Sequence, residues 1–600
     1  MKNLESLFKV FKQIAYLVPS YMRRKSIMVF LSMIVSSLLE LLGVSIIVPF
    51  LQLLTSPESI KSEWYISWLF RINPEVSNRF LLIFVSGSFV FVYLVKNGFL
   101  IFAAYIQSVF SATYMQDASE RMLFSFLKRP YEFFTNSNSS ILLRGINADI
   151  SAVYYSLLSI FTLLGECLTI ICIGAFLVIT DWIVAVTAII VATVCMLLIV
   201  FGFKNKIKSA SGEFREANAE KYKYSLQAIH GIKEISVLDR KDVFINTYGE
   251  AAKKEKNAII TKEFLAACPD RIIEGFCISG FIVIVCIRIL MGGDISKFIT
   301  ILGTFAMGAF KILPSFSKIS SRINSIVFYV PSIQSCYDIF KEAEKIDKEN
   351  IESDKNSTIF LEQRKQISFS DSIEFKGVSW KYLNSERYLF SDISLSIKKG
   401  QSIAFIGSSG AGKSTLADIL LGLYKPQKGL ITVDGVSIYD IPHDWCKMIG
   451  YVPQNVYLID DSISKNVAFG LPDELIDYER VWNALEQAQM KSFVENLPNG
   501  LDTVVGERGV KVSGGQRQRI AIARALYEDP DVLVFDEATS ALDSETENSV
   551  MEAIEALQGI KTLVIVAHRI STIKNCDVIY RIEDGVIVTV DKEELFESIM

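Results

Sequence analysis

The stretch "SIAFIGSSGAGKSTLADILLGLY", residues 402–424, decides the fold of the C-terminal part of the chain. It joins an apolar strand to a glycine-rich loop and then to a helix. The glycines let backbone N–H groups turn inward on a phosphate, and the N-terminus of the helix adds partial positive charge. A loop of this composition between a strand and a helix predicts a nucleotide-binding α/β domain.

The residues of this loop predict how ATP and Mg²⁺ are held as cofactors. Lys413 should reach the β- and γ-phosphates, and Ser414 should ligate Mg²⁺. The rest of the predicted nucleotide-binding loop consists of Gly407, Ser408, Ser409, Gly410, Ala411, Gly412 and Thr415.

A second stretch, "DVLVFDEATSALD" at residues 531–543, is an apolar strand that ends in two carboxylates. Asp536 is placed to hold the Mg²⁺ shell. Glu537, the next residue, is placed to polarise a water for attack on the γ-phosphate. Together with the loop, these carboxylates predict an ATP hydrolase.

The composition indicates that this hydrolase domain is attached to a membrane protein. The chain has 600 residues, half of them hydrophobic, and should hold more than one domain. Its net charge is -5, so it lacks the excess of basic residues that is typical of nucleic-acid-binding proteins, and nucleic acid is not expected as a partner. The nine cysteines show no metal-type or paired spacing.

Long apolar runs are confined to the first half of the chain. Each is long enough to cross a hydrocarbon core of ~30 Å. They cover residues 27–54, 80–110, 153–179, 182–203, 272–291 and 298–316. The sequence therefore predicts an all-α six-helix transmembrane domain at 26–340, followed by an α/β P-loop ATPase domain at 371–600.

The basic residues at the ends of the runs set the predicted orientation. Arg23, Arg24 and Lys25 precede the first run, and Lys128 and Arg129 follow the second. Basic flanks favour the cytoplasm, which makes this a multi-pass membrane protein with a cytoplasmic ATPase domain.

Two flanking segments complete the predicted domain organisation. Residues 1–25 alternate apolar and basic residues and predict an interfacial elbow helix. Residues 341–370 are charged and polar and predict a linker between the two domains.

The C-terminal domain, residues 371–600, resembles the ATP-binding domain of ABC transporters. Its "VSGGQ" at residues 512–516 is similar to the signature loop of that family, with Val512 where leucine is usual. The resemblance implies that Tyr382 stacks on adenine and that Gln454 senses Mg²⁺ and the attacking water. It also implies that His568 contacts the γ-phosphate and that Asp543 lies at a dimer interface.

The signature loop also raises the question of why one chain carries two anion-binding loops about a hundred residues apart. The γ-phosphate already has a full set of residues in the first loop together with Asp536, Glu537, Gln454 and His568. The resemblance implies that the signature residues cap the nucleotide held by Lys413 of a second copy. They are Ser513, Gly514, Gly515 and Gln516. We therefore expect a homodimer.

Ionisable residues inside the apolar runs point to a cargo site. Lys96 interrupts the second run, Lys311 interrupts the sixth, and Arg271 lies near one end of the fifth. Such residues are costly in a membrane and usually face a cavity, although Arg271 has the alternative of extending to water at a helix end. A basic cavity suits an anionic cargo such as a phosphate or pyrophosphate.

The first external loop adds a second indication of cargo. Residues 58–72 predict an amphipathic helix on the outer face with Trp64 and Trp68 on its apolar side. The alternative is a helix that only caps the first two spans.

These features resemble flippases for lipid-linked oligosaccharides, as used in bacterial protein glycosylation. That family has a short external helix and cavity arginines that engage the lipid pyrophosphate. Lys96, Arg271 and Lys311 lie in matching contexts, with lysine at two of the three positions. The resemblance implies transport of a lipid-linked saccharide to the outer leaflet of a bacterial inner membrane.

The alternatives are a general lipid or multidrug exporter of the same architecture, a soluble ABC ATPase and a nucleotide-gated channel. A general exporter would respond to many amphiphiles. The six long apolar runs argue against the soluble protein, and the complete hydrolytic set argues against the channel.

Overall fold

The computed structural model describes residues 2–55, 78–180, 182–290, 295–361, 368–383, 385–537, 544–567 and 573–592. The chain forms two compact units. We call Met1–Arg129 with Asn136–Glu349 the membrane unit, and Pro130–Thr135 with Asn350–Met600 the ATPase unit.

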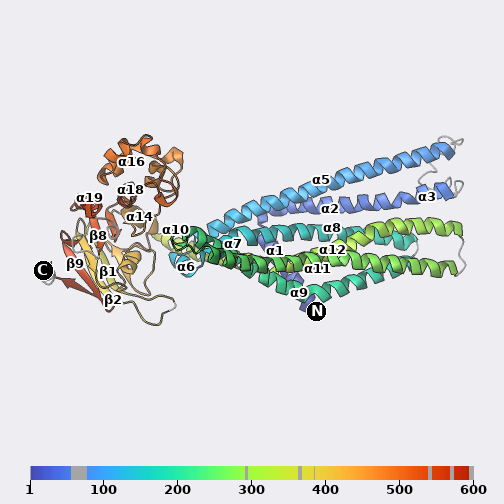
Figure 1. Cartoon of the computed structure of the whole chain (residues 1–600), viewed down its shortest axis with the longest axis horizontal. Helices are drawn as coiled ribbons and strands as arrows, with labels where there is room; N and C mark the ends of the chain where they lie inside the picture. The colour runs from blue at the N-terminus through green and yellow to red at the C-terminus, as the bar shows by residue number, and fades with distance from the viewer. Residues whose placement is uncertain are drawn as a thin grey trace. The chain divides into compact units, whose positions relative to one another are not determined.

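The membrane unit is built from long helices that run alongside one another (Figure 1). In chain order the helices are α1 (Lys2–Leu17), α2 (Arg23–Ser45), α3 (Ile47–Thr55), α5 (Asn78–Leu127), α7 (Ser139–Arg144), α8 (Ile150–Thr180), α9 (Trp182–His230), α10 (Ile232–Val237), α11 (Lys241–Leu290) and α12 (Ile295–Leu361). Within the described ranges, α2 packs on α5 and α8, and α9 packs on α11. The predicted all-α architecture of this half of the chain is confirmed.

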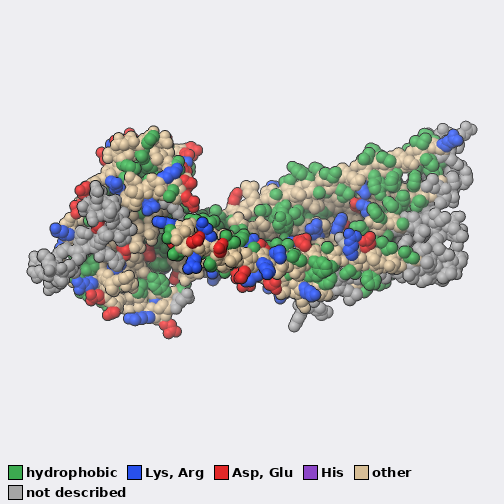
Figure 2. All heavy atoms as spheres, viewed as in Figure 1, with side chains coloured by type: hydrophobic (Ala, Val, Ile, Leu, Met, Phe, Trp, Pro, Cys, Tyr) green, Lys and Arg blue, Asp and Glu red, His purple; other side chains and the backbone are tan. Residues whose placement is uncertain are grey.

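Three stretches in the described part are long and apolar enough to cross a membrane: Ser20–Leu51, Arg79–Leu127 and Ser139–Thr180. The other three predicted spans lie on α9, α11 and α12. Hydrophobic side chains are spread along the surface of this unit (Figure 2). On α5 they include Ile101, which is 73% exposed, as expected of a surface that faces lipid.

The helix bounds differ in several places from the segments that the sequence predicts. The first run is divided between α2 and α3 at Ile46, three residues before Pro49, which has no N–H to donate to the preceding turn. The described start of the predicted linker is helical, because α12 continues to Leu361. α5 and α11 have 50 residues each, ~75 Å at 1.5 Å per residue, far more than a bilayer requires.

The ATPase unit combines two sheets with surrounding helices. Its strands are β1 (Ser372–Trp380), β2 (Phe390–Lys398), β3 (Ser402–Ile406), β4 (Lys428–Val433), β5 (Val436–Ser437), β6 (Ile449–Val452), β7 (Val532–Asp536), β8 (Thr562–Val566), β9 (Val578–Glu583) and β10 (Val586–Val590). Its helices are α6 (Tyr131–Asn136), α13 (Lys413–Leu420), α14 (Pro442–Met448), α15 (Ile463–Val467), α16 (Tyr478–Gln487), α17 (Lys491–Glu495), α18 (Gly514–Leu526) and α19 (Ser544–Glu555).

The larger sheet positions the nucleotide loop. Its strand order is β10-β9-β3-β8-β7-β6, parallel except for β10. β7 and β8 are buried along their whole length, which explains their continuous apolar sequence. The smaller sheet, β2-β1-β4-β5, is antiparallel. β3 and β7 are separated only by β8, so the residues that follow these two strands emerge at the same edge of the sheet.

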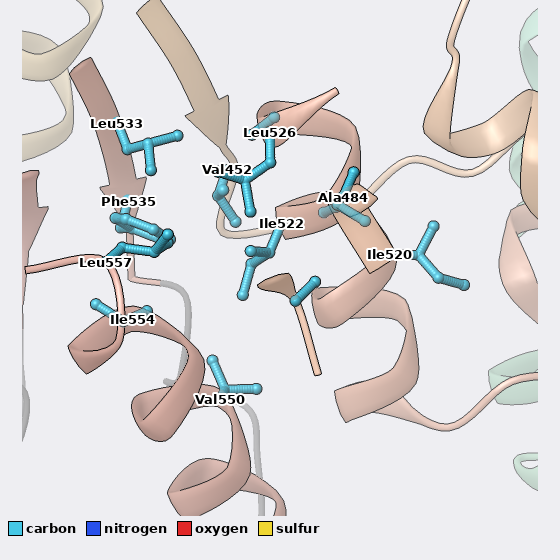
Figure 3. Packing of buried hydrophobic residues seen from close by; sticks show 14 of the residues in the cluster. Val452, Ala484, Ile520, Ile522, Leu526, Leu533, Phe535, Val550, Ile554 and Leu557 are labelled. Atoms are coloured by element: carbon cyan, nitrogen blue, oxygen red, sulfur yellow. The ribbon is translucent and has the colours of Figure 1, made fainter. Parts of the chain in front are cut away.

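A hydrophobic cluster joins this sheet to the helix that follows the signature loop. Ile522 and Leu526 of α18 pack with Val452 of β6, while Ile554 of α19 lies near Phe535 of β7 (Figure 3). All these side chains are nearly or fully buried. The signature loop is therefore carried by a helix fixed to the core of the ATPase unit.

Candidate nucleotide site and transport cavity

The nucleotide loop connects β3 to α13 and requires glycine for steric reasons. Gly412 has φ 99°, and a Cβ there would lie 2.6 Å from Cζ of Phe390. Lys413 begins α13, is buried, and donates from Nζ to the carbonyl oxygens of Gly407 and Ser408, both at 3.0 Å. Burial lowers the pKa of Lys413, although the carboxylates of Glu537 and Asp536 act in the opposite direction.

A serine and an aspartate at the carboxyl edge of the sheet form the predicted Mg²⁺ position. Oγ of Ser414 donates to Oδ1 of Asp536 at 2.9 Å. Both are hard oxygen ligands, and Mg²⁺ typically takes one or two protein oxygens and completes its shell with phosphate oxygens and water. The residues present therefore fit Mg²⁺, which Ser414 and Asp536 would hold.

Glu537 is held in an unusual backbone conformation directly after β7. Its φ of 47° is left-handed, and its N–H donates to the carbonyl of Val566 at 3.1 Å. The side-chain amide of Gln454 donates a hydrogen bond to its carboxylate. The structure thus brings together two residues that are 83 positions apart in the sequence, in roles that suit a general base and the group that orients it.

The predicted adenine platform lies beside the same loop. The hydroxyl of Tyr382 is 3.1 Å from Oγ1 of Thr415, and its ring meets Trp380 edge to face at 4.4 Å. Tyr382 is half-exposed. An anchored ring with an open side has the form that stacking on a purine requires, and this role of Tyr382 stays a prediction.

One acidic residue near the Mg²⁺ position was not predicted from the sequence. Asp418 follows the loop on α13, and burial raises its pKa to about 6, with a further contribution from the carboxylate of Asp536. No motif marks this residue, because its environment is created by packing rather than by spacing.

The signature loop begins α18 with a capping box. Oγ of Ser513 accepts from the backbone N–H of Gln516 at 3.3 Å, and Oε1 of Gln516 accepts from the backbone N–H of Ser513 at 2.8 Å. Two of the predicted signature residues therefore hold each other in place. The first-turn amides of Gly514 and Gly515 have no carbonyl one turn earlier in the helix, which leaves them oriented for an anion.

Four predicted site residues lie outside the described residues. They are Trp64, Trp68, Asp543 and His568. Their roles stay predictions.

In the membrane unit, two of the three predicted cargo residues meet on one carboxylate. Nζ of Lys96 on α5 lies 3.2 Å from Oε2 of Glu40 on α2, and Nζ of Lys311 on α12 lies 3.0 Å from the same oxygen. The third, Arg271, has a side chain that is 86% exposed and pairs with Glu274 on its own helix. The structure does not bring Arg271 to this cluster.

A cavity of about 370 Å³ lies next to this cluster. Glu40 and Lys311 line this cavity. Its lining also contains Glu166 on α8, whose carboxylate pairs with Nζ of Lys318 at 2.7 Å. Oγ of Ser315 donates to the other oxygen of Glu166 at 2.6 Å. Further polar lining comes from Ser36, Gln107, Thr162 and Thr169.

Glu40 and Glu166 change the expected character of the cavity. Three lysines, Lys96, Lys311 and Lys318, face these two glutamates, so the cluster has a net charge of +1 rather than +3. The sequence signal was present, since each glutamate stands alone within a predicted span, and an isolated carboxylate in an apolar run calls for a partner.

Comparison with known proteins supports the assignment of both the membrane unit and the ATPase unit. Residues 26–307 match the ABC transporter transmembrane region, and residues 390–540 match the ATPase domain of the ABC transporter family. The chain is 30% identical over 472 residues to the ATP-dependent lipid A-core flippase of Pasteurella multocida, which covers 76% of this chain and 77% of that protein. It is 45% identical over 218 residues to the protein of the same name from Ralstonia nicotianae, which covers 36% of this chain and 37% of that protein.

Among solved structures, a bacterial Atm1-family ABC exporter with ATP bound superposes with a TM-score of 0.71 at 20% identity, over 97% of each chain. A helical transmembrane domain joined to a P-loop ATPase defines an ATP-driven membrane transporter. The chain belongs to the ABC transporter family, as an exporter-type half-transporter that couples ATP hydrolysis to transport.

Proposed function

We propose that this transporter is a flippase that moves a lipid-linked pyrophosphate oligosaccharide from the inner to the outer leaflet of a bacterial inner membrane. The observation that carries the proposal is the cavity inside the membrane unit, where charged and polar side chains stand among apolar ones such as Met33, Leu100 and Phe161. A cavity lined by charges, an amide and hydroxyls between apolar spans suits the transfer of a polar headgroup, while the lipid tail stays in the bilayer. The name of the relatives, lipid A-core flippase, supports a lipid cargo.

The lining suits a saccharide. Carboxylates accept hydrogen bonds from sugar hydroxyls, while lysine ammonium and glutamine amide groups donate to them. Lys311 and Lys318 are seven residues apart on α12, two helical turns or ~10 Å along one face. Each of these lysines is paired with a carboxylate, Lys311 with Glu40 and Lys318 with Glu166, which gives a row of two ion pairs on the cavity lining. A chain of sugar rings can exchange hydrogen bonds with such a row at each step.

The net charge supports an anionic linkage. Each chain contributes a net charge of +1 from its three lysines and two glutamates. In a homodimer the two copies supply two uncompensated positive charges, and a pyrophosphate diester carries two negative charges. The capping box at Ser513 and Gln516 supports the homodimer, because it holds a signature loop in the form that would meet a partner's nucleotide.

The proposal is tested by flipping of a fluorescent undecaprenyl-pyrophosphate oligosaccharide in proteoliposomes supplied with ATP. We expect Lys311→Gln to reduce flipping at least about tenfold, since it removes a cavity cation, while Arg271→Gln retains it. ATPase stimulation by many unrelated amphiphiles, with no preference for the pyrophosphate lipid, would instead establish a general lipid or multidrug exporter.

A further inference from the structure

Glu40 lies between two lysines that differ in access to the cavity. Lys311 contacts both carboxylate oxygens, at 3.1 and 3.0 Å, and lines the cavity with 29% of its side chain exposed. Lys96 contacts only Oε2, its side chain is 2% exposed, and it is not among the cavity-lining residues. Only one of the two lysines is therefore available to a molecule in the cavity.

The side chain of Lys96 is held in place by the packing of α2 against α5. Its ammonium lies 4.3 Å from the ring centroid of Tyr93, which favours a cation. Gly43 leaves the necessary space, since a Cβ there would lie 3.2 Å from Cδ and 3.3 Å from Nζ of Lys96. A buried cation that cannot reach the cavity is costly in an apolar environment unless its partner stays in place. A ligand in the cavity cannot be that partner, so Glu40 must be.

We propose that Glu40 is an exchangeable counter-ion. This proposal rests on the proposed function, since it requires a cargo with a phosphoryl group. When an anionic group binds Lys311, Glu40 releases Lys311 and remains paired with Lys96. Before binding, one carboxylate serves two ammonium groups; after binding, each ammonium group has its own anion. Lys96 is thus a positioning residue, and the cavity accepts an anion without leaving a charge unpaired.

The exchange makes a prediction that a direct cargo contact does not make. If Lys96 only holds Glu40, its removal leaves Glu40 with Lys311 as its sole partner, and an incoming anion must break that pair outright. Removing Glu40 as well should then free Lys311 again. A second substitution next to the first would repair the defect.

The test uses the full-length protein in nanodiscs with farnesyl diphosphate as an anionic probe and farnesol as the uncharged comparison. We expect Lys96→Met to weaken diphosphate binding at least about tenfold. Lys96→Met with Glu40→Gln should return to within about threefold of wild type, and Glu40→Gln alone should bind more tightly than wild type. Farnesol binding should change in none of them. A double variant no better than Lys96→Met would overturn the exchange.

Two controls separate this outcome from misfolding. Basal ATPase activity without lipid reports an intact protein, and Glu274→Gln removes a carboxylate from an ion pair away from the cluster. Where Lys96→Met does not fold, the double variant decides alone, because it leaves no buried charge unpaired. Diphosphate binding in that variant more than about tenfold weaker than in wild type refutes an internal competitor. The probe carries no sugar, so failure of oligosaccharide flipping would remove the proposed cargo and leave the exchange standing. Normal oligosaccharide flipping together with unchanged diphosphate binding in Lys96→Met would support the proposed cargo and refute the exchange of Glu40.

Discussion

The side-chain amide of Gln454 donates a hydrogen bond to the carboxylate of Glu537, at the point where β7 ends. The backbone of Glu537 has a φ of 47°, a conformation that a non-glycine residue adopts only when its surroundings impose it. This geometry orients the carboxylate away from the strand and toward the amide. A water placed there for attack on the γ-phosphate would meet the predicted base and the side-chain amide together.

Glu537→Gln should nearly abolish ATP hydrolysis and retain ATP binding. An amide cannot take a proton from water, and loss of a general base costs about 10²–10⁴-fold in rate. Single-turnover hydrolysis and binding of a fluorescent ATP analogue measure the two properties. Hydrolysis at the wild-type rate would remove Glu537 as the base.

A mixed dimer tests whether the signature loop acts on the partner's nucleotide. One chain carries Lys413→Ala and the other Ser513→Arg. If the loop acts across the dimer, one composite site contains both defects and the other contains none, so the mixed dimer should hydrolyse ATP while either variant alone does not. Differential affinity tags isolate the mixed species. Inactive mixed dimers would mean that Ser513 serves the Lys413 of its own chain.

Asp418 predicts a pH dependence of stability. Burial raises its pKa to about 6 from an ordinary value of 3.8, so the folded ATPase unit holds this proton more tightly than the unfolded chain. Its contribution to stability is therefore lost as pH rises from about 4 to about 6. Asp418→Asn should raise the Tm of the nucleotide-free transporter at pH 7.5 and leave it nearly unchanged at pH 4, measured by thermal shift. An equal shift at both pH values would exclude titration of Asp418 as the cause.

Gly412→Ala should weaken nucleotide binding. The added methyl group would meet Phe390 at 2.6 Å in a backbone conformation that alanine disfavours, and the loop must shift. We expect a loss of ATP affinity of at least about tenfold, or about 1.4 kcal/mol. Gly410→Ala is the control for the steric clash. Gly410 also has a positive φ, of 83°, but an added Cβ there would have no atom within 4 Å.

The nucleotide site was largely predictable because its ligands follow strands in fixed order. Lys413 and Ser414 are the first two residues of α13, Asp536 is the last residue of β7, and Glu537 follows it. Parallel strands bring residues at such positions to one edge. The membrane cavity was less predictable. Apolar periodicity indicates that a helix spans the membrane but not how far it is rotated about its axis, and this rotation separates a residue such as Lys311, which lines the cavity, from Arg271, which is exposed.

The missed residue Glu40 illustrates the same limit. The cost of a buried charge indicates from sequence that Lys96 and Glu40 each need a partner. Nothing in the sequence states that they partner each other across 56 positions, or that Lys311 shares the carboxylate. Pairing depends on which helices are neighbours, and that is a property of the bundle.

The mutual hydrogen bonds of Ser513 and Gln516 have a consequence for the energetics of the transport stroke. A recognition loop that is shaped by its own chain loses little conformational entropy when two ATPase units close over ATP. In the proposed homodimer, the binding energy of the nucleotide would then be available for moving the units together instead of for ordering the loop. Weakening this cap would reduce the free energy that is available for closing the two ATPase units. The residues that would bind ATP in the same chain would be unchanged.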